Sequence, residues 1–367
     1  MPDSSAADPL PHSAPTISAA PALPGNRHSW IGRAAGAFNA IYLFGFLLLI
    51  LLLLWWGERH WLVSLLLFAP AYALLLPLLI LTPFCLIVRP RLVLWHLLCA
   101  AIVYFGYMEY SWSFRPSRYS DALKVVTFNS GQADRRQFQS FVDSEKPDLI
   151  MLQDARYRGA DYTRMWPDRH VAGRGEFVVI SRYPVQHAEL VDKPTWDGQP
   201  VAARFEVVRE NKPFIVYNVH LPTPRSQLHR FLSARVVKDL FGDEERGKAF
   251  ATYREWVDAR IKLARDLAEV FASEKQPFIA CGDFNTPDRG YIHRILSRGM
   301  VDAHAQAGRG WGLTFPGGIS GLAARHGPWL RIDYAYAGRG WEPVFCHTDS
   351  GSRSQHRAVA AHFVPLL

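Results

Sequence analysis

Hydrophobic and polar positions divide the chain into two unlike parts. Three stretches near the amino terminus contain no Lys, Arg, Asp or Glu: Ala37–Trp56, Trp61–Val88 and Leu92–Met108. A helix needs about 20 apolar residues to cross the hydrocarbon core of a bilayer. The first stretch has that length, the second is long enough to tilt or bend at its prolines, and the third is near the lower limit. The pattern predicts three membrane-spanning helices.

Two other interpretations of the apolar stretches are weaker. Buried helices of a soluble core would not be expected to be separated by the charged sequences GERH (57–60) and RPR (89–91). A cleavable signal peptide is disfavoured because the first apolar region is too long and lacks a small-residue cleavage site. Four tryptophans lie where aromatic belts meet a membrane surface: Trp55, Trp56, Trp61 and Trp112. The sequence therefore favours a multi-pass membrane protein.

The charges that flank the apolar stretches indicate an orientation. Four arginines would share the side of the amino terminus: Arg27, Arg33, Arg89 and Arg91. Three would share the opposite side: Arg59, Arg115 and Arg118. Loops rich in Lys and Arg face the cytoplasm. The four-to-three difference predicts a cytoplasmic amino terminus and an extracytoplasmic location for everything after residue 112.

Changes in composition predict four segments. Residues 1–30, rich in Ala, Pro and Ser, are expected to form a disordered tail. Residues 31–112 form the three-helix anchor, and residues 113–122 form a linker. Residues 123–367 have the composition of a globular domain. The anchor and the domain are therefore expected to differ in both environment and function.

Short apolar runs alternate with helical patterns in the globular part. The β-rich runs are residues 123–128, 149–152, 177–181, 202–208, 214–221, 278–284 and 331–337. The runs at 202–208 and 214–221 are expected to form an antiparallel pair. This alternation predicts an α/β fold in which two mixed β-sheets pack together and helices flank them.

The charged region between His220 and Pro277 is expected to contain two amphipathic helices. The apolar stripe of the first consists of Leu228, Phe231, Leu232, Val236 and Leu240. That of the second consists of Tyr253, Trp256, Ile261, Leu263, Leu267 and Phe271. This spacing places each set on one helix face. Helices packed on a sheet are favoured over an arm that lies on the membrane.

Composition and charge restrict the class of protein. With 49% hydrophobic residues, the 367-residue chain is not disordered throughout. Its four cysteines are too few for a disulfide scaffold. The formal net charge of +8 suits an anionic partner, which could be a nucleic acid or the phosphates of lipid headgroups.

Polar side chains that can hold a metal ion or move protons follow the β-rich runs. They are Asn129, Gln153, Asp154, Asn218, His220, Asp283, Asn285, Asp333 and His356. Carboxylate and amide oxygens suit a hard cation such as Mg²⁺. The chain has no HExxH or CxxC zinc motif, no P-loop and no GxSxG nucleophile motif. The residue types therefore favour Mg²⁺ bound to a phosphate oxygen, with a histidine managing the proton of an attacking water.

The order of the motifs strengthens this interpretation. TFN (127–129), LQD (152–154), NVHL (218–221), GDFN (282–285) and RIDY (331–334) precede a terminal SQH that ends at His356. This series, which covers about residues 121–367, resembles the endonuclease/exonuclease/phosphatase superfamily. The resemblance implies a four-layered α/β sandwich with metal-dependent phosphoesterase activity, here preceded by three transmembrane helices.

The resemblance also implies a role for each site residue. Asn129 and Asp154 would hold the metal, Mg²⁺ or alternatively Mn²⁺, and His220 would contact the scissile phosphate. Asp283 and Asn285 would position the attacking water and the phosphate. Asp333 would orient His356, which would act as the general acid–base or stabilise charge on the phosphate.

Two positions depart from the superfamily pattern. Asp154 stands where the superfamily usually has Glu, and Gln355 stands where it usually has Asp. The shorter carboxylate can still ligate Mg²⁺ if the ion shifts or a water intervenes. The amide removes one negative charge near the metal, which could alter metal binding or substrate choice.

The substrate is left open among three hypotheses. Three spans followed by this domain resemble the bacterial teicoplanin-resistance membrane proteins. The resemblance implies a multi-pass location in a bacterial plasma (inner) membrane and a lipid-linked phosphate or diphosphate of the envelope as substrate. Tethering the domain to a bilayer raises its effective concentration toward membrane substrates. The second hypothesis is an extracytoplasmic nuclease with nucleic acid as partner. The third is a non-catalytic, membrane-tethered module that binds a phosphate ligand.

Overall fold

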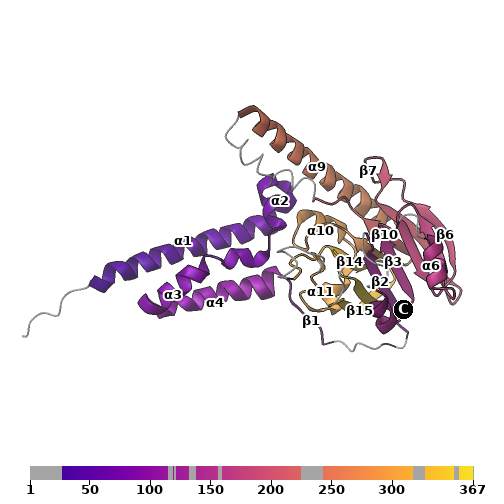
Figure 1. Ribbon diagram of the computed structural model, residues 1–367, viewed down its shortest axis with the longest axis horizontal. Coiled ribbons are helices and arrows are strands. Elements are labelled where there is room, and N and C mark those ends of the chain that lie inside the picture. Colours follow the sequence, from indigo (N-terminus) through magenta and orange to yellow (C-terminus); the bar gives the residue numbers. More distant parts are fainter. Residues whose placement is uncertain are drawn as a thin grey trace, which may run out of the picture.

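The computed structural model of the chain describes residues 27–114, 119, 121–131, 138–155, 159–224, 243–316, 327–350 and 355–366 (Figure 1). The predicted tail before residue 27 lies outside the described residues. The same holds for the amphipathic helix predicted around Leu228–Leu240.

The amino-terminal part consists of helices that lie side by side and project from the globular domain (Figure 1). They are α1 (Arg27–Trp55), η1 (Gly57–Arg59), α2 (Trp61–Leu67), η2 (Ala71–Leu75), α3 (Leu78–Val88), η3 (Pro90–Leu92), α4 (Val93–Ala101) and the π-helical η4 (Ile102–Tyr107). Three segments are long and apolar enough to cross a bilayer: Trp30–Trp55, Ala71–Val88 and Pro90–Tyr107. Length and composition therefore support three spans.

The second apolar stretch differs from its sequence prediction because it is not one helical segment. Pro70 has an extended backbone with ψ of 124°, and the chain turns there between α2 and η2. Proline has no N–H to donate, so helices rarely continue through it. The α2 segment instead packs on the globular domain, where Ser64 Oγ lies 3.0 Å from Tyr253 Oη. The span therefore begins at Ala71 rather than Trp61.

A buried polar cluster joins the three spans. His96 Nε2 lies 2.6 Å from Asn39 Oδ1, and His96 Nδ1 lies 2.8 Å from Thr82 Oγ1. Each residue comes from a different span, and polar side chains inside a bilayer need such partners. Large apolar side chains cover the outer faces, as expected for surfaces in contact with lipid; examples are Phe44, Leu79, Ile80, Ile87 and Leu94.

The two ends of this helical bundle are chemically distinct. At the far end, Arg89 packs against the first helix, since a side chain at Gly32 would lie 3.2 Å from Arg89 Nε. At the near end, the η1 loop, the end of η4 and Glu109 contact the globular domain. The start of α1 and the Arg89–Arg91 turn thus share one end, and the globular domain occupies the other.

The globular domain contains two six-stranded mixed sheets within its described residues. The first has the order β12 (Val301–Asp302), β14 (Asp333–Ala337), β11 (Phe278–Asp283), β10 (Lys212–His220), β9 (Ala202–Arg209) and β6 (Val185–Leu190). The second has the order β15 (Trp341–Thr348), β16 (Val359–Pro365), β2 (Leu123–Asn129), β3 (Leu149–Gln153), β5 (Phe177–Ser181) and β4 (His170–Arg174). The predicted antiparallel pairing of β9 and β10 is confirmed.

Helices and two small strand pairs complete the described part of the domain. The described helices are α5 (Gln139–Glu145), α6 (Gly159–Met165), α9 (Asp243–Ser273), α10 (Tyr291–Leu296) and α11 (Ala303–Ala307). Two small pairs are formed by β1 (Ser111–Trp112) with β13 (Arg309–Gly310), and by β7 (Thr195–Trp196) with β8 (Gln199–Pro200).

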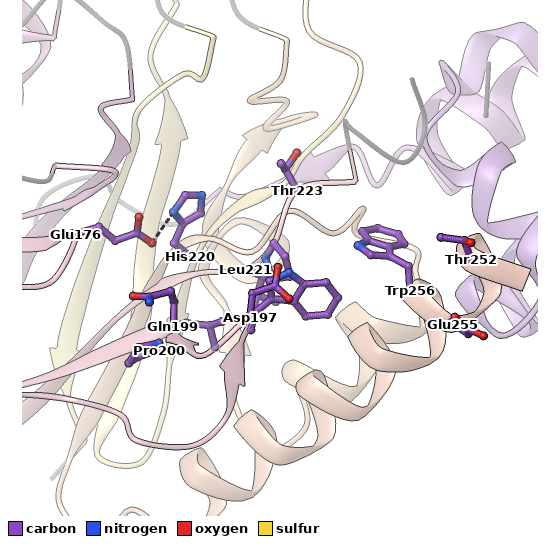
Figure 2. A pocket seen from close by; sticks show the side chains of 13 residues that line it. Glu176, Asp197, Gln199, Pro200, His220, Leu221, Thr223, Thr252, Glu255 and Trp256 are labelled. Atoms are coloured by element: carbon purple, nitrogen blue, oxygen red, sulfur yellow. Dashed lines mark hydrogen bonds and ion pairs between the residues drawn. The ribbon is translucent and has the colours of Figure 1, made fainter. Parts of the chain in front are cut away.

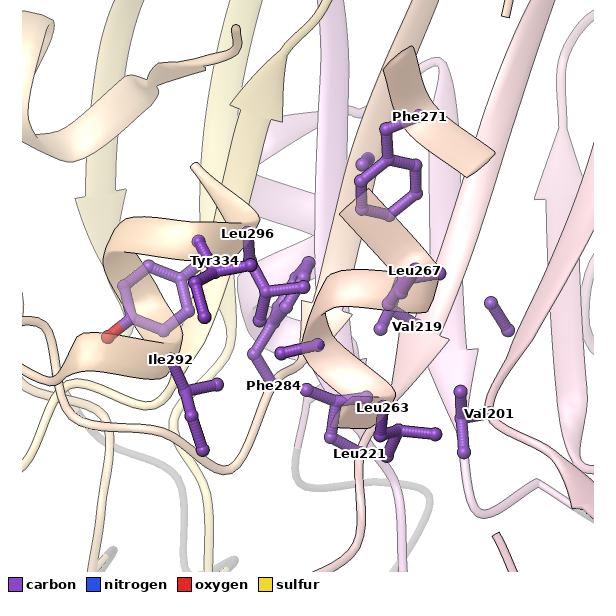
Figure 3. Packing of buried hydrophobic residues seen from close by; sticks show 14 of the residues in the cluster. Val201, Val219, Leu221, Leu263, Leu267, Phe271, Phe284, Ile292, Leu296 and Tyr334 are labelled. Atoms are coloured by element: carbon purple, nitrogen blue, oxygen red, sulfur yellow. The ribbon is translucent and has the colours of Figure 1, made fainter. Parts of the chain in front are cut away.

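Apolar side chains on both faces of each sheet allow the two sheets to pack together between two layers of helices. In β10, Phe214 and Val216 face the other sheet, whereas Ile215 and Tyr217 face α9. Residues of both sheets interdigitate in the central cluster, and α5 and α6 cover the outer face of the second sheet. Helices α9 and α10 cover the outer face of the first (Figure 3). The predicted four-layered α/β sandwich is confirmed.

Helix α9 confirms the second amphipathic helix predicted from the sequence. All six residues of its predicted stripe are buried: Tyr253, Trp256, Ile261, Leu263, Leu267 and Phe271. They pack on strand residues such as Val219 and on Leu221 (Figure 3). Burial of one large apolar side chain contributes about 1.5–3 kcal/mol. This part of the helix therefore packs on the sheet.

Candidate active site

The candidate residues lie at or near the ends of strands, at one end of the apolar core between the two sheets. Side chains alternate between the two faces of a strand. Asn129, Asp283 and Asp333 lie on the same face of their strands as the residues of the central core, which is the face toward the other sheet. The apolar core thus ends in a buried polar cluster, and these side chains meet although they are distant in sequence.

Asp283 is the centre of this cluster and is only 1% exposed. Its Oδ2 accepts hydrogen bonds from Asn129 Nδ2 at 2.9 Å and Asn285 Nδ2 at 3.0 Å, and its Oδ1 accepts one from the Asn285 backbone N–H at 2.9 Å. His220 Nε2 and His356 Nε2 each lie 3.7 Å from Oδ2. The carboxylate is therefore positioned by two asparagines between two imidazoles.

The GDFN sequence explains how Asp283 reaches this position. Gly282 has φ of +148°, and a Cβ atom there would lie 2.0 Å from the backbone oxygen of Val219 on β10. Only glycine allows this close approach of β11 to β10. Beyond the strand, Asn285 has φ of +47°, which turns the chain so that its amide returns to Asp283.

Asp333 and His356 form a buried pair across the two sheets. His356 Nδ1 lies 3.0 Å from Asp333 Oδ2, so the carboxylate orients the ring and directs Nε2 toward Asp283. The Asp333 backbone N–H donates to Thr314 Oγ1, and the Phe315 ring lies 5.1 Å from the imidazole. Burial raises the pKa of Asp333, and the nearby Asp283 carboxylate adds to this effect.

The second histidine has a carboxylate partner that the sequence interpretation missed. His220 Nδ1 lies 3.0 Å from Glu176 Oε1 (Figure 2). Burial alone would lower the pKa of His220, but the hydrogen bond to Glu176 and the charges of Asp283 and Glu176 raise it overall. Glu176 lies in the turn between β4 and β5, directly before an apolar strand, where a lone Glu gives no sequence signal.

Asn129 and Asp154 converge on Gly131. A Cβ atom at Gly131 would lie 3.3 Å from Asn129 Oδ1 and 3.5 Å from Asp154 Oδ2. Asp154 follows β3 with φ of +49°, a conformation that non-glycine residues adopt rarely and often at functional sites. The two oxygens expected to hold a metal thus both lie beside Gly131, although Asp154 is itself exposed.

The donor set fits a hard divalent cation. Among the described residues, one group of three candidate metal ligands has donor atoms within 4.8 Å of one another: Asp283, Asp333 and His356. Carboxylate and amide oxygens dominate the wider cluster, as Mg²⁺ prefers. A cation near two buried carboxylates would also relieve their mutual repulsion.

Two other polar residues noted in the sequence have a structural role. Asn218 Nδ2 donates to the backbone oxygens of Leu152 and Val178, and Gln153 Nε2 donates to Asn218 Oδ1 at 2.7 Å. These bonds join β10 to the strands of the other sheet. Asn218 and Gln153 therefore support the site from the core.

A groove of about 660 Å³ extends from the His220–Glu176 pair (Figure 2). Trp196, from the β7–β8 hairpin, and Trp256, on α9, line it with ring centroids 6.4 Å apart. The Asp197–Gly198 turn of the hairpin has positive φ at both positions, as a two-residue hairpin requires. None of the described lining residues is Lys or Arg.

Comparison with known proteins agrees with this geometry. The Endonuclease/Exonuclease/phosphatase family profile matches residues 126–356. This range contains all seven residues singled out above as metal ligands or catalytic groups: Asn129, Asp154, His220, Asp283, Asn285, Asp333 and His356. No curated protein matches the sequence.

Solved structures with similar folds share little sequence with this chain. An endonuclease/exonuclease/phosphatase family protein from Bacteroides thetaiotaomicron is 15% identical, with a TM-score of 0.48; the match covers 68% of this chain and 100% of that chain. Humanized D. rerio TDP2 is 15% identical, with a TM-score of 0.49, over 67% of this chain and 100% of that chain. The Bacteroides thetaiotaomicron mannosyl-6-phosphatase Bt3783 is 14% identical, with a TM-score of 0.46, over 66% of this chain and 99% of that chain.

Proposed function

This chain belongs to the endonuclease/exonuclease/phosphatase family of metal-dependent phosphoric ester hydrolases, and on that premise we propose a membrane-anchored, Mg²⁺-dependent enzyme that hydrolyses a lipid-linked envelope phosphate or diphosphate. The observation that carries the proposal is the junction of the two parts of the chain. The strand ends that hold Asp283 and Asp333 continue into segments that contact the near end of the helical bundle. The reaction centre is thus fixed close to the spans.

Each residue of the cluster would have a separate role in hydrolysis. Asn129 and Asp154 would hold Mg²⁺, which when bound offsets negative charge on the phosphate. Asp283 and Asn285 would hold the attacking water in line with the phosphorus. His356, oriented by Asp333, would exchange the proton.

The other histidine would act on the phosphate itself. His220 is held by Glu176 with its Nε2 directed toward the Asp283 side of the cluster. Its raised pKa favours the protonated ring, which can donate to a phosphate oxygen whose negative charge grows in the transition state.

The groove supports a substrate whose phosphate carries an organic group rather than a polyanion. A nucleic acid needs several Lys or Arg contacts along its backbone, and the described lining residues of the groove include none. The two tryptophans offer an apolar wall beside the reaction centre. The groove leads to α9, which contacts α2 at the near end of the bundle.

We propose that the globular domain lies outside the cytoplasm. The Arg89–Arg91 turn shares the far end of the bundle with the start of α1, and cationic loops face the cytoplasm. An alkaline phosphatase reporter fused after Leu367 should therefore be active in the periplasm, and one fused within the Arg89–Arg91 turn should be inactive. The opposite pattern would place the site in the cytoplasm and would make nucleic acids or nucleotides the leading substrates.

The substrate class is tested with the purified full chain in detergent micelles. We expect Mg²⁺-dependent release of inorganic phosphate from a polyprenyl diphosphate, with water supplying the oxygen and the lipid monophosphate remaining. We expect no cleavage of plasmid or single-stranded DNA under the same conditions. DNA cleavage without phosphate release would identify a nuclease, and phosphate-ligand binding without turnover of either substrate would identify a binding module.

A further inference from the structure

Glu58, in the loop between the first and second spans, is buried in the globular domain with 1% of its surface exposed. Its carboxylate accepts hydrogen bonds from Thr286 Oγ1 at 3.2 Å and from the backbone N–H groups of Tyr291 and Ile292. A buried carboxylate is costly unless it is paired in this way. These contacts join the membrane anchor to the segment that follows Asp283.

A glycine lies on each side of this contact, facing the Glu58 carboxylate in the domain and the Tyr291 backbone in the anchor. A Cβ atom at Gly290 would lie 2.2 Å from Glu58 Oε1, and one at Gly57 would lie 2.8 Å from the Tyr291 nitrogen. Gly57 also has φ of +50°. The loop of the anchor and the α10 end of the domain are therefore shaped for this contact.

Four further hydrogen bonds connect this contact to the catalytic turn. Thr286 follows Asn285, whose side chain and backbone both donate to Asp283. Tyr334 Oη donates to the Thr286 backbone oxygen at 2.8 Å, and the buried Arg260 donates to the Asn285 backbone oxygen at 2.7 Å. Burial lowers the pKa of Arg260 to about 10, and the Glu58 charge opposes that effect. Glu58 thus stabilises both the turn and the cation that supports it.

A second carboxylate, Glu109, makes the corresponding contact after the third span. Its Oε2 lies 2.9 Å from Arg331 Nη2, and its Oε1 lies 2.9 Å from Arg289 Nη1. Arg331 is 2% exposed, stands two positions before Asp333 and also pairs with Asp302 at 2.6 Å. The anchor therefore contacts the chain segments adjacent to both catalytic carboxylates, Asp283 and Asp333.

We propose that Glu58 and Glu109 are positioning residues of the active site, so that the membrane anchor holds the catalytic strand ends in their reactive geometry. This inference rests on the proposed phosphoesterase function. Neither residue touches the substrate. Loss of the Glu58 charge removes one of the charges that favour the Arg260 cation and weakens the bond to Thr286, which loosens the turn from Asp283 to Thr286. A displacement of about 1 Å in such a turn can lower the rate by about 10²-fold.

The test uses the full chain in lipid nanodiscs with the soluble probe bis(p-nitrophenyl) phosphate and Mg²⁺. We expect Glu58→Gln and Glu109→Gln each to lower kcat by about 10-fold or more while KM stays near the wild-type value. Thr286→Val, which removes the hydroxyl donor to Glu58, should lower kcat by a smaller factor. The matched control is Glu210→Gln, because the Glu210 side chain is 76% exposed. It should leave both constants unchanged.

Circular dichroism and thermal unfolding of every variant separate positioning from folding. Wild-type kcat per folded molecule in Glu58→Gln and Thr286→Val would overturn the inference. So would a loss of activity that equals the loss of folded protein. If the wild-type chain in nanodiscs hydrolysed neither this probe nor a polyprenyl diphosphate, the proposed function itself would fail, and the inference with it.

Discussion

Asp283→Ala should lower kcat for phosphoester hydrolysis by about 10²-fold or more, equal to about 2.7 kcal/mol of transition-state stabilisation. Asp283 accepts hydrogen bonds from Asn129 and Asn285 and lies 3.7 Å from both histidines. Its removal would separate the groups that must act together on the water and the phosphate. The measurement is steady-state kinetics of the full chain in detergent with Mg²⁺.

The isosteric Asp283→Asn variant distinguishes charge from shape. Both carboxylate oxygens accept from N–H donors, so an amide nitrogen at either position would face another donor. We therefore expect Asp283→Asn to lose nearly as much activity as Asp283→Ala. Asp168→Asn, at an exposed loop position, should behave as wild type. Near-normal turnover by folded Asp283→Asn would show that the carboxylate is not part of the reaction.

The sheet architecture could be predicted because its signal is local. Alternating apolar positions within 202–208 and 214–221 indicated paired strands, and the apolar stripe of Tyr253–Phe271 indicated a helix on a sheet. The order of strands within each sheet could not be obtained in this way. Contacts such as that between β16 and β2 join residues more than 200 positions apart, and no local pattern encodes them.

The start of the second span is marked in the sequence by a proline and a polar residue. The absence of charged residues makes Trp61–Val88 look like a single span. Pro70 and the polar Ser64 instead mark the part of this stretch that lies outside the bundle. Burial of Ser64 against Tyr253 requires α9, which lies about 190 positions later. A hydropathy pattern treats a lipid-facing helix and a domain-facing helix alike.

The site could be predicted in part from strand ends and motif order. Asn129, His220, Asp283, Asp333 and His356 meet as that interpretation requires, because inward positions at the ends of neighbouring strands converge. Three carboxylates were missed as contributors: Glu176, Glu58 and Glu109. Glu176 lies in an ordinary hairpin turn. Glu58 owes its burial, and Glu109 its partial burial, to the docking of the anchor on the domain, and in the sequence both look like common interfacial charges.

His356→Ala should also lower kcat by about 10²-fold or more, the usual effect of removing a positioned acid–base group. Asp333→Asn should cost less, because it removes the orienting charge but keeps the imidazole and one acceptor for His356 Nδ1. His170→Ala, at an exposed edge-strand position, is the matched control and should retain full activity. Circular dichroism of each variant establishes that the compared proteins are folded.

The most direct measurement of the central claim is inorganic phosphate release from a polyprenyl diphosphate by wild-type protein and His356→Ala at equal folded concentrations. It is made with Mg²⁺, after chelation with EDTA, and after Mg²⁺ is restored. We predict that the wild-type rate disappears on chelation and returns with Mg²⁺, and that the variant is slower by about 10²-fold whenever Mg²⁺ is present. Folded His356→Ala that releases phosphate at the wild-type rate would contradict the assignment of the reaction to this cluster.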